Sequence, residues 1–263
     1  MPPSAPLRRF TLGLALMVPA AAGFADLMPP TLTAGLDSSA NAARSRPAPP
    51  AAERLDPLPA DAPIVVLVDT IPLGARYVEH TLCTCPMPHL DASQAGAAAE
   101  NIAELLPEAA AFARTQGANV LVLFGAEHGV PVPLPGVSDP VTLAFDHPGY
   151  VLVFFRCDLP CRLPKIPVRF TTDLPPAAFK AQATAVSYRV GRDGGYSRTL
   201  ASWVYGNLSR FMTQADQLGF DRISIPSAEG PDTEDVLLPG CDRPLRVSRD
   251  HPSLNVTIYR NKA

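Results

Sequence analysis

The chain has 263 residues, 47% of them hydrophobic, and a formal net charge of −3 at pH 7. This acidic balance argues against nucleic acids and anionic membrane surfaces as partners. The length and the hydrophobic content suffice for one large domain, or for two small ones with cores of their own.

Residues 1–25 have the features of a secretory signal. Arg8 and Arg9 precede an apolar stretch at 10–22, and small residues flank a cleavage site predicted after Ala25. The stretch is shorter than the roughly 20 apolar residues of a spanning helix. We therefore expect a cleaved signal, a periplasmic or secreted protein, and no membrane span. Cleavage would remove two arginines and no acids, which changes the net charge to −5.

Residues 26–62 are rich in Pro, Ala, Ser and Arg and show no sustained helix or strand period. Such a segment buries too little apolar surface to offset its conformational entropy. We expect a disordered tether ahead of a folded part of roughly 200 residues.

Residues 63–165 are predicted to form a first module. The apolar run 64–68 indicates a buried strand, and 73–85 a second strand or an extended arm. An alanine-rich segment at 91–116 predicts a helix that Asp91 or Ser93 caps and Gly117 ends. Pro107 predicts a kink or two abutting helices within it. Strands at 120–125 and 150–156 follow, joined by a proline-marked loop.

Residues 166–263 repeat this pattern and form a predicted second module. A helix at 202–218 leads through Gly219 to strands at 222–225 and 254–260. Gly117 and Gly219 are 102 residues apart, and the closing strands align at an offset of 104. We predict an α/β fold of α+β character, with a mixed sheet and helices on one face, and interpret the chain as two tandem β-α-β-β modules. The alternative is two generic β-α-β units that share only a glycine at the helix end.

Short motifs in residues 64–161 resemble those of RcsF-type domains and related small bacterial envelope lipoproteins. The matching positions are Leu73, Gly74, Val78 and Cys83, the segment GANVLVL at 117–123, and the strand end FRC at 155–157. The chain lacks the lipid-attachment cysteine of that family. The resemblance implies an envelope domain whose cysteines are joined across the sheet, with Cys83 or Cys85 bridging to Cys157 or Cys161.

The cysteines also leave metal and redox chemistry open, since exported thiols are usually paired, metal-bound or in redox exchange. The disulfide candidates are Cys83, Cys85, Cys157, Cys161 and Cys241. One stretch combines five soft or borderline donors, His80, Cys83, Cys85, Met87 and His89. These ligand types suit Cu(I) or Zn. Apart from this alternative we expect no cofactor.

The sequence has no GxSxG, HExxH, P-loop or GxGxxG motif. Glu127-His128 and Asp146-His147 lie in a loop region, and we expect them to be ordinary polar loop residues. The predicted function is a non-enzymatic binding, sensing or structural role in the cell envelope, stabilised by disulfides, with another envelope protein as partner. The alternatives are a periplasmic Cu or Zn binder that uses the His80 to Met87 region, and a hydrolase without a recognisable motif.

Overall fold

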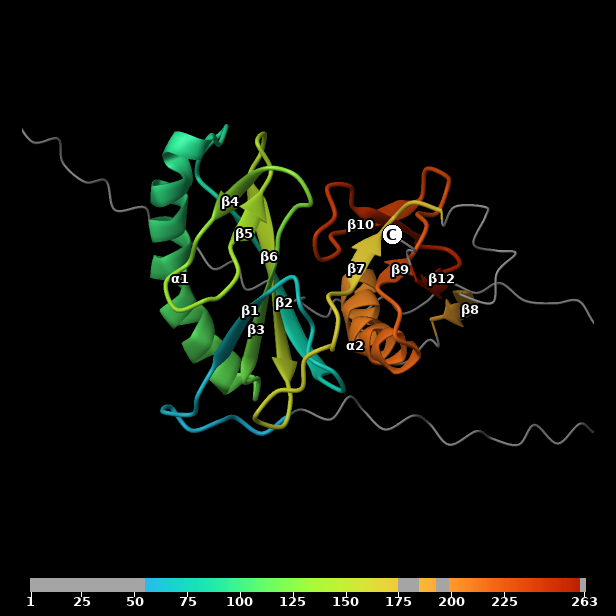
Figure 1. Cartoon of the computed structure of the whole chain (residues 1–263), viewed down its shortest axis with the longest axis horizontal. Helices are drawn as coiled ribbons and strands as arrows, with labels where there is room; N and C mark the ends of the chain where they lie inside the picture. Colours follow the sequence, from blue (N-terminus) through green and yellow to red (C-terminus); the bar gives the residue numbers. More distant parts are fainter. Residues whose placement is uncertain (1–54, 175–184, 193–198, 261–263) are drawn as a thin grey trace, which may run out of the picture. The chain divides into compact units, whose positions relative to one another are not determined.

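The computed structural model describes residues 55–174, 185–192 and 199–260, all of which belong to one compact unit, Ala48–Ala263. The predicted signal and most of the predicted tether lie outside these residues. The described elements are β1 (Val65–Val68), β2 (Arg76–Thr84), α1 (Ala95–Thr115), β3 (Val120–Phe124), β4 (Val130–Val132), β5 (Val141–Leu143), β6 (Gly149–Arg156), β7 (Arg169–Thr171), β8 (Ala185–Gly191), α2 (Leu200–Leu218), β9 (Arg222–Ser224), β10 (Thr233–Val236), β11 (Leu245–Ser248) and β12 (Ser253–Tyr259). Figure 1 shows their arrangement.

The first sheet has the strand order β1-β3-β6-β2. β1 is parallel to β3, whereas β6 runs antiparallel to both of its neighbours, β3 and β2. Every residue of β3 is buried. Alternate residues of β3 belong to two different core clusters, with Val122 on one face and Leu121 on the other. The predicted apolar strands are thus buried on both faces of this sheet.

The helix of the first module begins at a capping box. Asp91 accepts hydrogen bonds from the backbone of Ser93 and Gln94, and the Gln94 side chain accepts from the backbone N–H of Asp91. A single 3-10 turn at Ala92–Gln94 precedes α1. α1 then continues through Pro107 as one helix, so of the two predicted alternatives, a kink or two abutting helices, the second is wrong. Proline removes only one backbone donor, and alanine-rich turns with high helix propensity flank it.

The segment just before β1 packs on the end of α1. The N–H of Leu58 donates to the carbonyl of Arg114, and the Arg114 side chain donates to the carbonyl of Ala62. Gly117 ends the helix at φ +77°, and a Cβ there would lie 2.6 Å from the Cβ of Leu55. Residues 55–62, which were predicted to belong to the tether, therefore join the fold.

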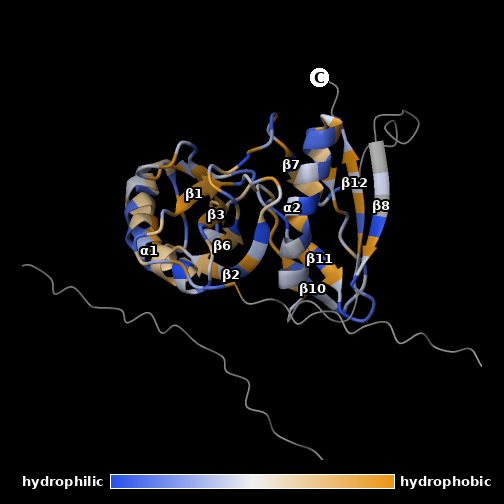
Figure 2. Ribbon diagram, turned by 90° about the horizontal axis from the view of Figure 1, so that it is seen from below, coloured by the Kyte–Doolittle hydropathy of each residue, from blue (hydrophilic) through white to orange (hydrophobic). Residues whose placement is uncertain are grey.

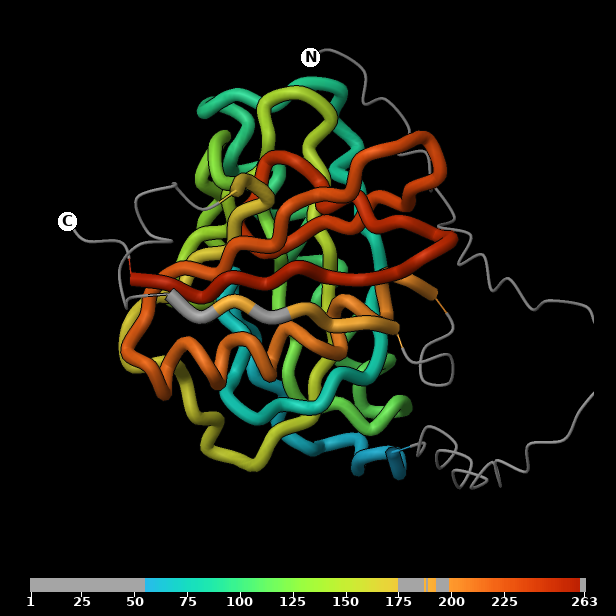
Figure 3. The backbone as a smooth tube through the Cα atoms, turned by 90° about the vertical axis from the view of Figure 1, so that its right-hand side faces the viewer, coloured from blue at the N-terminus to red at the C-terminus, as the bar shows by residue number. Residues whose placement is uncertain are grey.

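The second sheet repeats the strand order and directions of the first. Its order is β7-β9-β12-β8, with β7 parallel to β9 and β12 antiparallel to β9 and β8. Figure 3 looks onto this sheet, where β12, in red, lies between β8 and β9. In each module the helix follows the second strand, and a two-stranded hairpin, β4-β5 or β10-β11, precedes the last strand. Neither hairpin was predicted; β4-β5 lies within the predicted proline-marked loop, and β10-β11 lies between the predicted strands 222–225 and 254–260.

The strand registers also correspond between the modules. Val65 pairs with Val120 in the first sheet, and Arg169 pairs with Arg222 in the second. Backbone hydrogen bonds outside the strands recur as well. The N–H of Ala126 donates to the carbonyl of Thr142 at 2.8 Å, and that of Ala228 to the carbonyl of Arg246 at 2.7 Å. The two modules therefore share a topology down to individual hydrogen bonds.

Two clusters of buried hydrophobic residues show which sheet face each helix packs against. One unites α1 with one face of the first sheet. The other unites the opposite face of that sheet with α2 and with one face of the second sheet. Each sheet thus has the helix of its own module on one face, as predicted, and α2 covers a face of the first sheet as well. In Figure 2 β3 is coloured as hydrophobic, whereas β12 alternates between hydrophobic and polar residues, in line with its alternating burial. Among the described residues, no helix is long and apolar enough to cross a membrane.

Candidate functional site

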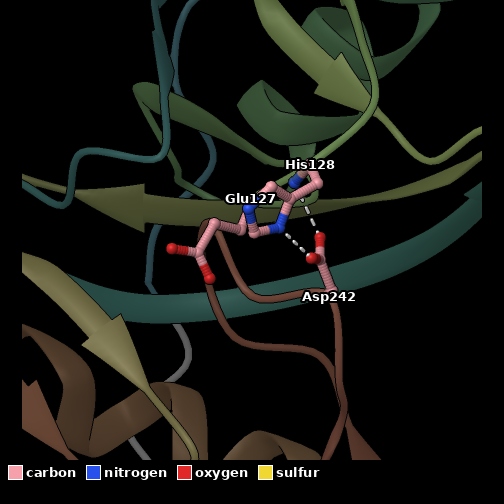
Figure 4. A group of neighbouring side chains, drawn as sticks. All are labelled: Glu127, His128 and Asp242. Atoms are coloured by element: carbon pink, nitrogen blue, oxygen red, sulfur yellow. Dashed lines mark hydrogen bonds and ion pairs between the residues drawn. The ribbon is translucent and has the colours of Figure 1, made fainter.

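The candidate site lies where loops of the two modules meet. Glu127 and His128 follow the end of β3, and Asp242 lies in the turn between β10 and β11. All three side chains are exposed, and one ligand atom from each lies within 4.8 Å of the others (Figure 4). In the described part of the chain, they form the one such group of three or more His, Cys, Asp or Glu side chains.

Asp69 fixes the two loops that carry these side chains. One oxygen, Oδ1, accepts the N–H of Gly125 at 2.9 Å and the N–H of Gly240 at 3.1 Å. Gly125 precedes Glu127 by two residues, and Gly240 precedes Asp242 by two. Asp69 itself directly follows β1, with a left-handed backbone at φ 46°. A single carboxylate therefore sets the spacing between the two sides of the site.

The Asp69 carboxyl is unusually basic. Burial raises its pKa from 3.8 to about 6, although the N–H groups of Gly125 and Gly240 oppose this shift. Desolvation destabilises the charged form, and two backbone donors compensate only in part. Asp69 therefore changes its charge in a mildly acidic range, next to both loops of the site.

Close packing and hydrogen bonds also restrict the two loops that carry His128 and Asp242. Gly129 adopts φ +153°, and a Cβ at this position would lie 1.9 Å from the carbonyl oxygen of Leu143, so only glycine fits beside His128. On the other loop the buried thiol of Cys241 donates to the carbonyl of Phe170 at 3.4 Å. Burial, followed by nearby carboxylates led by Glu127, raises the pKa of this thiol to about 12. Cys241 is accordingly a neutral packing residue beneath Asp242.

His128 and Asp242 form a two-point pair. The backbone N–H of His128 donates to Asp242 Oδ1 at 2.8 Å, and the ring Nδ1 is paired with Oδ2. The hydrogen bond from Asp242, then its negative charge, raise the pKa of His128, and Glu127 adds to the shift. Burial alone would raise the pKa of Asp242, but the hydrogen bonds and the charge of His128 outweigh it, so that this pKa is lowered. The pair uses the ring nitrogen Nδ1, which faces Asp242.

The structure corrects the predicted disulfide pairing. Cys157 is joined to Cys161, with a Cα to Cα distance of 6.2 Å, while Cys83, Cys85 and Cys241 are free. Cys83 lies opposite Tyr150 near the start of β6, whereas Cys157 directly follows its end. Seven residues of extended chain separate these points, or about 23 Å at 3.3 Å per residue. A bridge across the sheet is therefore out of reach.

Cys157 is held by an asparagine. Asn119 is buried just before β3, and its Nδ2 donates to the carbonyl of Cys157 at 2.8 Å. The N–H of Cys157 donates to Asn119 Oδ1 at 3.0 Å. This reciprocal pair fixes the chain where β6 ends, so that Cys161, four residues on, is the cysteine within reach.

The five predicted metal ligands do not gather in one place. His80 lies opposite Val153, whereas Cys83 lies opposite Tyr150, and these partners belong to cores on opposite faces of the sheet. His80 therefore cannot share an ion with Cys83. His89 is exposed and pairs through Nδ1 with Asp146 at 2.9 Å. The three sulfur residues remain together on the α1 side.

His80 belongs instead to an aromatic cluster. Its Nδ1 is hydrogen-bonded to the hydroxyl of Tyr77 at 2.8 Å, and its ring meets that of Tyr205 edge-on, with centroids 5.0 Å apart. The Tyr77 hydroxyl also contacts Ser202 Oγ, near the start of α2, at 3.1 Å. Burial lowers the pKa of His80 despite the nearby carboxylates of Glu79 and Glu234. A neutral imidazole in this setting fits a packing role between the first sheet and α2.

Sequence reasoning found part of the candidate site and missed the rest. It noted Glu127 and His128 but treated them as ordinary loop residues, and it did not single out Asp69 or Asp242. An aspartate directly after a buried apolar strand is a usable signal, since Asp69 follows β1. Nothing local to Asp242 indicates that it meets His128, which is 114 positions away.

Comparisons with protein-family models, with curated proteins and with solved structures gave no match. The resemblance to RcsF-type domains therefore stays a prediction.

Proposed function

We propose that this chain is an exported, non-enzymatic binding protein whose ligand is a divalent cation of the zinc type. Glu127, His128 and Asp242 hold the cation. One observation carries the proposal: the three side chains come from two modules, and one ligand atom of each lies within 4.8 Å of the others. The hydrogen bonds of Asp69 to both loops support it, because they fix the spacing before any ion arrives.

The donor set favours this class of cation. One imidazole and two carboxylates are borderline and hard ligands, which suit Zn²⁺ and neighbouring divalent transition metals better than Cu(I). Three protein ligands leave a coordination position for water or for a side chain of a partner. All three side chains are exposed, so such a partner can reach the ion. We propose another envelope protein in that role.

Cation binding has a consequence for stability. Glu127 and His128 come from the first module and Asp242 from the second, so a bound ion links the two. A ligand that binds the folded chain but not the unfolded chain increases the free energy of unfolding, and the increase grows with the ligand concentration. The proton on His128 competes with the ion, so affinity falls as the pH drops below the raised pKa of this histidine.

Two features support export. The pattern of residues 1–25 is that of a secretory signal. The disulfide between Cys157 and Cys161 is of a kind that persists mainly in oxidising compartments.

Calorimetric titration of Zn²⁺ into the purified protein tests the proposal. We expect one equivalent to bind at pH 7.5, with at least about tenfold weaker binding for Glu127→Gln or Asp242→Asn, since each removes one charged ligand. The matched control is Glu229→Gln, because Glu229 is exposed and lies 102 residues after Glu127, at the corresponding place in the second module. Wild-type affinity in Asp242→Asn, or equal losses in the control, would overturn the proposal.

A further inference from the structure

Three sulfur atoms line one side of an extended segment. Cys83 belongs to β2, and Cys85 and Met87 follow at every second position. Cys85 is 7% exposed, and the half-buried Cys83 and Met87 pack against the same core cluster. The intervening Thr84 and Pro86 are exposed. Alternate residues of an extended chain share a face, so the three sulfur side chains point toward the same interior.

Prolines stiffen this segment. Pro86 and Pro88 flank Met87, and proline fixes φ and disfavours helical geometry in the residue before it. The N–H of Cys85 donates to the carbonyl of Pro148 at 2.9 Å, which ties the segment to the start of β6. The three sulfur side chains of Cys83, Cys85 and Met87, here called the sulfur row, therefore project from a backbone of restricted conformation.

The hydroxyl of Tyr150 is a second, independent feature of this site. It is 1% exposed and lies directly opposite Cys83 in the sheet. Its buried hydroxyl makes no hydrogen bond of normal geometry. The thiols of Cys83 and Cys85 are its electrostatic neighbours. A buried hydroxyl without a partner costs about 1–3 kcal/mol, so its retention calls for an explanation.

The two thiols explain the orientation of this hydroxyl. A neutral thiol is a weak acceptor, whereas a thiolate accepts a strong, charge-assisted hydrogen bond. The hydroxyl therefore gains its full hydrogen bond only when Cys83 is a thiolate. A bound cation is what keeps a buried thiol in that form.

We propose that Cys83 and Cys85, with the thioether of Met87 as an additional ligand, bind one Cu(I) ion. Thiolate and thioether sulfur are the soft ligands that select Cu(I). On binding, each thiol releases its proton to solvent and forms a sulfur-copper bond, so that two thiols and one Cu(I) give a complex of net charge −1 and two protons. Tyr150 donates to the Cys83 thiolate and stabilises it. This site differs in ligands and in place from the one proposed at His128, and His80 takes no part in it.

Competition with the Cu(I) chelator bathocuproine disulfonate, in reducing and anaerobic buffer, measures the affinity of the full chain. We expect one Cu(I) per wild-type chain and at least about a hundredfold weaker binding in Cys83→Ser, which removes one of two thiolates. Tyr150→Phe should weaken binding by about 10–100-fold, the usual effect of losing a hydrogen bond to a metal ligand. Cys241→Ser is the matched control, because Cys241 is a buried thiol outside the row, and it should bind as the wild type does.

A second measurement needs no variant. Cu(I) should protect both Cys83 and Cys85 of the wild-type chain from alkylation by N-ethylmaleimide, as mapped by mass spectrometry, and should leave the reactivity of Cys241 unchanged. The proposal is overturned if Cys83 is alkylated equally fast with and without Cu(I), or if Cys83→Ser keeps wild-type affinity. An equal loss in the Cys241→Ser control would also overturn it, because the ion would then lie elsewhere.

Discussion

Replacing Asp69 by asparagine should stabilise the protein at neutral pH. Asparagine keeps Oδ1, the oxygen that accepts from Gly125 and Gly240, and its amide takes the place of the protonated oxygen. It also tolerates the left-handed φ of 46° at this position. The substitution therefore imitates the protonated carboxyl and removes only the ability to ionise.

The magnitude follows from the raised pKa. The folded chain binds the Asp69 proton more tightly than the unfolded chain, because the pKa is about 6 in the fold against an ordinary 3.8. The contribution of Asp69 to stability is thus complete below about pH 4 and falls as the pH rises to about 6. One pKa unit corresponds to about 1.4 kcal/mol, which sets an upper limit of about 3 kcal/mol. Water that reaches the half-buried carboxylate lowers this value, so we expect about 1–3 kcal/mol.

Urea unfolding followed by Trp203 fluorescence measures the effect. Trp203 is the one tryptophan of the chain and is 7% exposed, so its emission reports on the core. The difference in unfolding free energy between Asp69→Asn and the wild type should be near zero at pH 4 and should favour the variant above pH 6. The difference between proteins cancels the titration of other groups. A variant that is less stable than the wild type at pH 7, or a difference that does not change with pH, would refute the reasoning.

Three further predictions concern the loops and the modules. Gly117→Ala should cost roughly 2–3 kcal/mol in urea unfolding, against about 1 kcal/mol for Gly219→Ala. A Cβ at Gly117 would lie 2.6 Å from the Cβ of Leu55, whereas one at Gly219 would meet the Arg260 side chain at 3.9 Å; equal costs would contradict this. By NMR titration the pKa of His128 should lie above 6.5 and fall in Asp242→Asn, and an unchanged value would be inconsistent with the pairing. The stability that this pairing contributes should be complete below pH 6.5 and be lost as the pH rises through the raised pKa. Cys157→Ser should cost about 2 kcal/mol, the value for a short closed loop, and an unfolding free energy that does not respond to reductant in the wild type would argue against the bridge.

The sequence predicts both helices and the strands that follow them well, because their signals are local, whereas β7 and β8 were not predicted individually. The apolar run of β3 and the glycine ends at Gly117 and Gly219 are such signals, and the offset of 102 residues between these glycines indicated the matching topologies. The hairpins were missed because β4 and β5 have three residues each and Pro131 interrupts β4. Strands this short have no period that a pattern search can detect.

The candidate site was harder to predict, because its residues meet only through the fold. Asp242 lies on the second module, and its contact with His128 depends on how the two modules pack. The predicted metal ligands show the opposite case, in which residues that are close in the sequence do not meet in the fold. His80 and Cys83 are three positions apart in β2, and because successive side chains of a strand point to opposite faces, the two lie on opposite faces of the sheet. Closeness in sequence did not indicate closeness in space.

Anomalous diffraction at the zinc edge, from crystals soaked in Zn²⁺, tests the central claim most directly. The account predicts one strong peak about 2.0–2.2 Å from a nitrogen of His128 and from carboxylate oxygens of Glu127 and Asp242. At the same limiting Zn²⁺ concentration, the peak should be weaker in crystals of Asp242→Asn. A peak confined to other residues, or none at these three side chains, would contradict the proposed function.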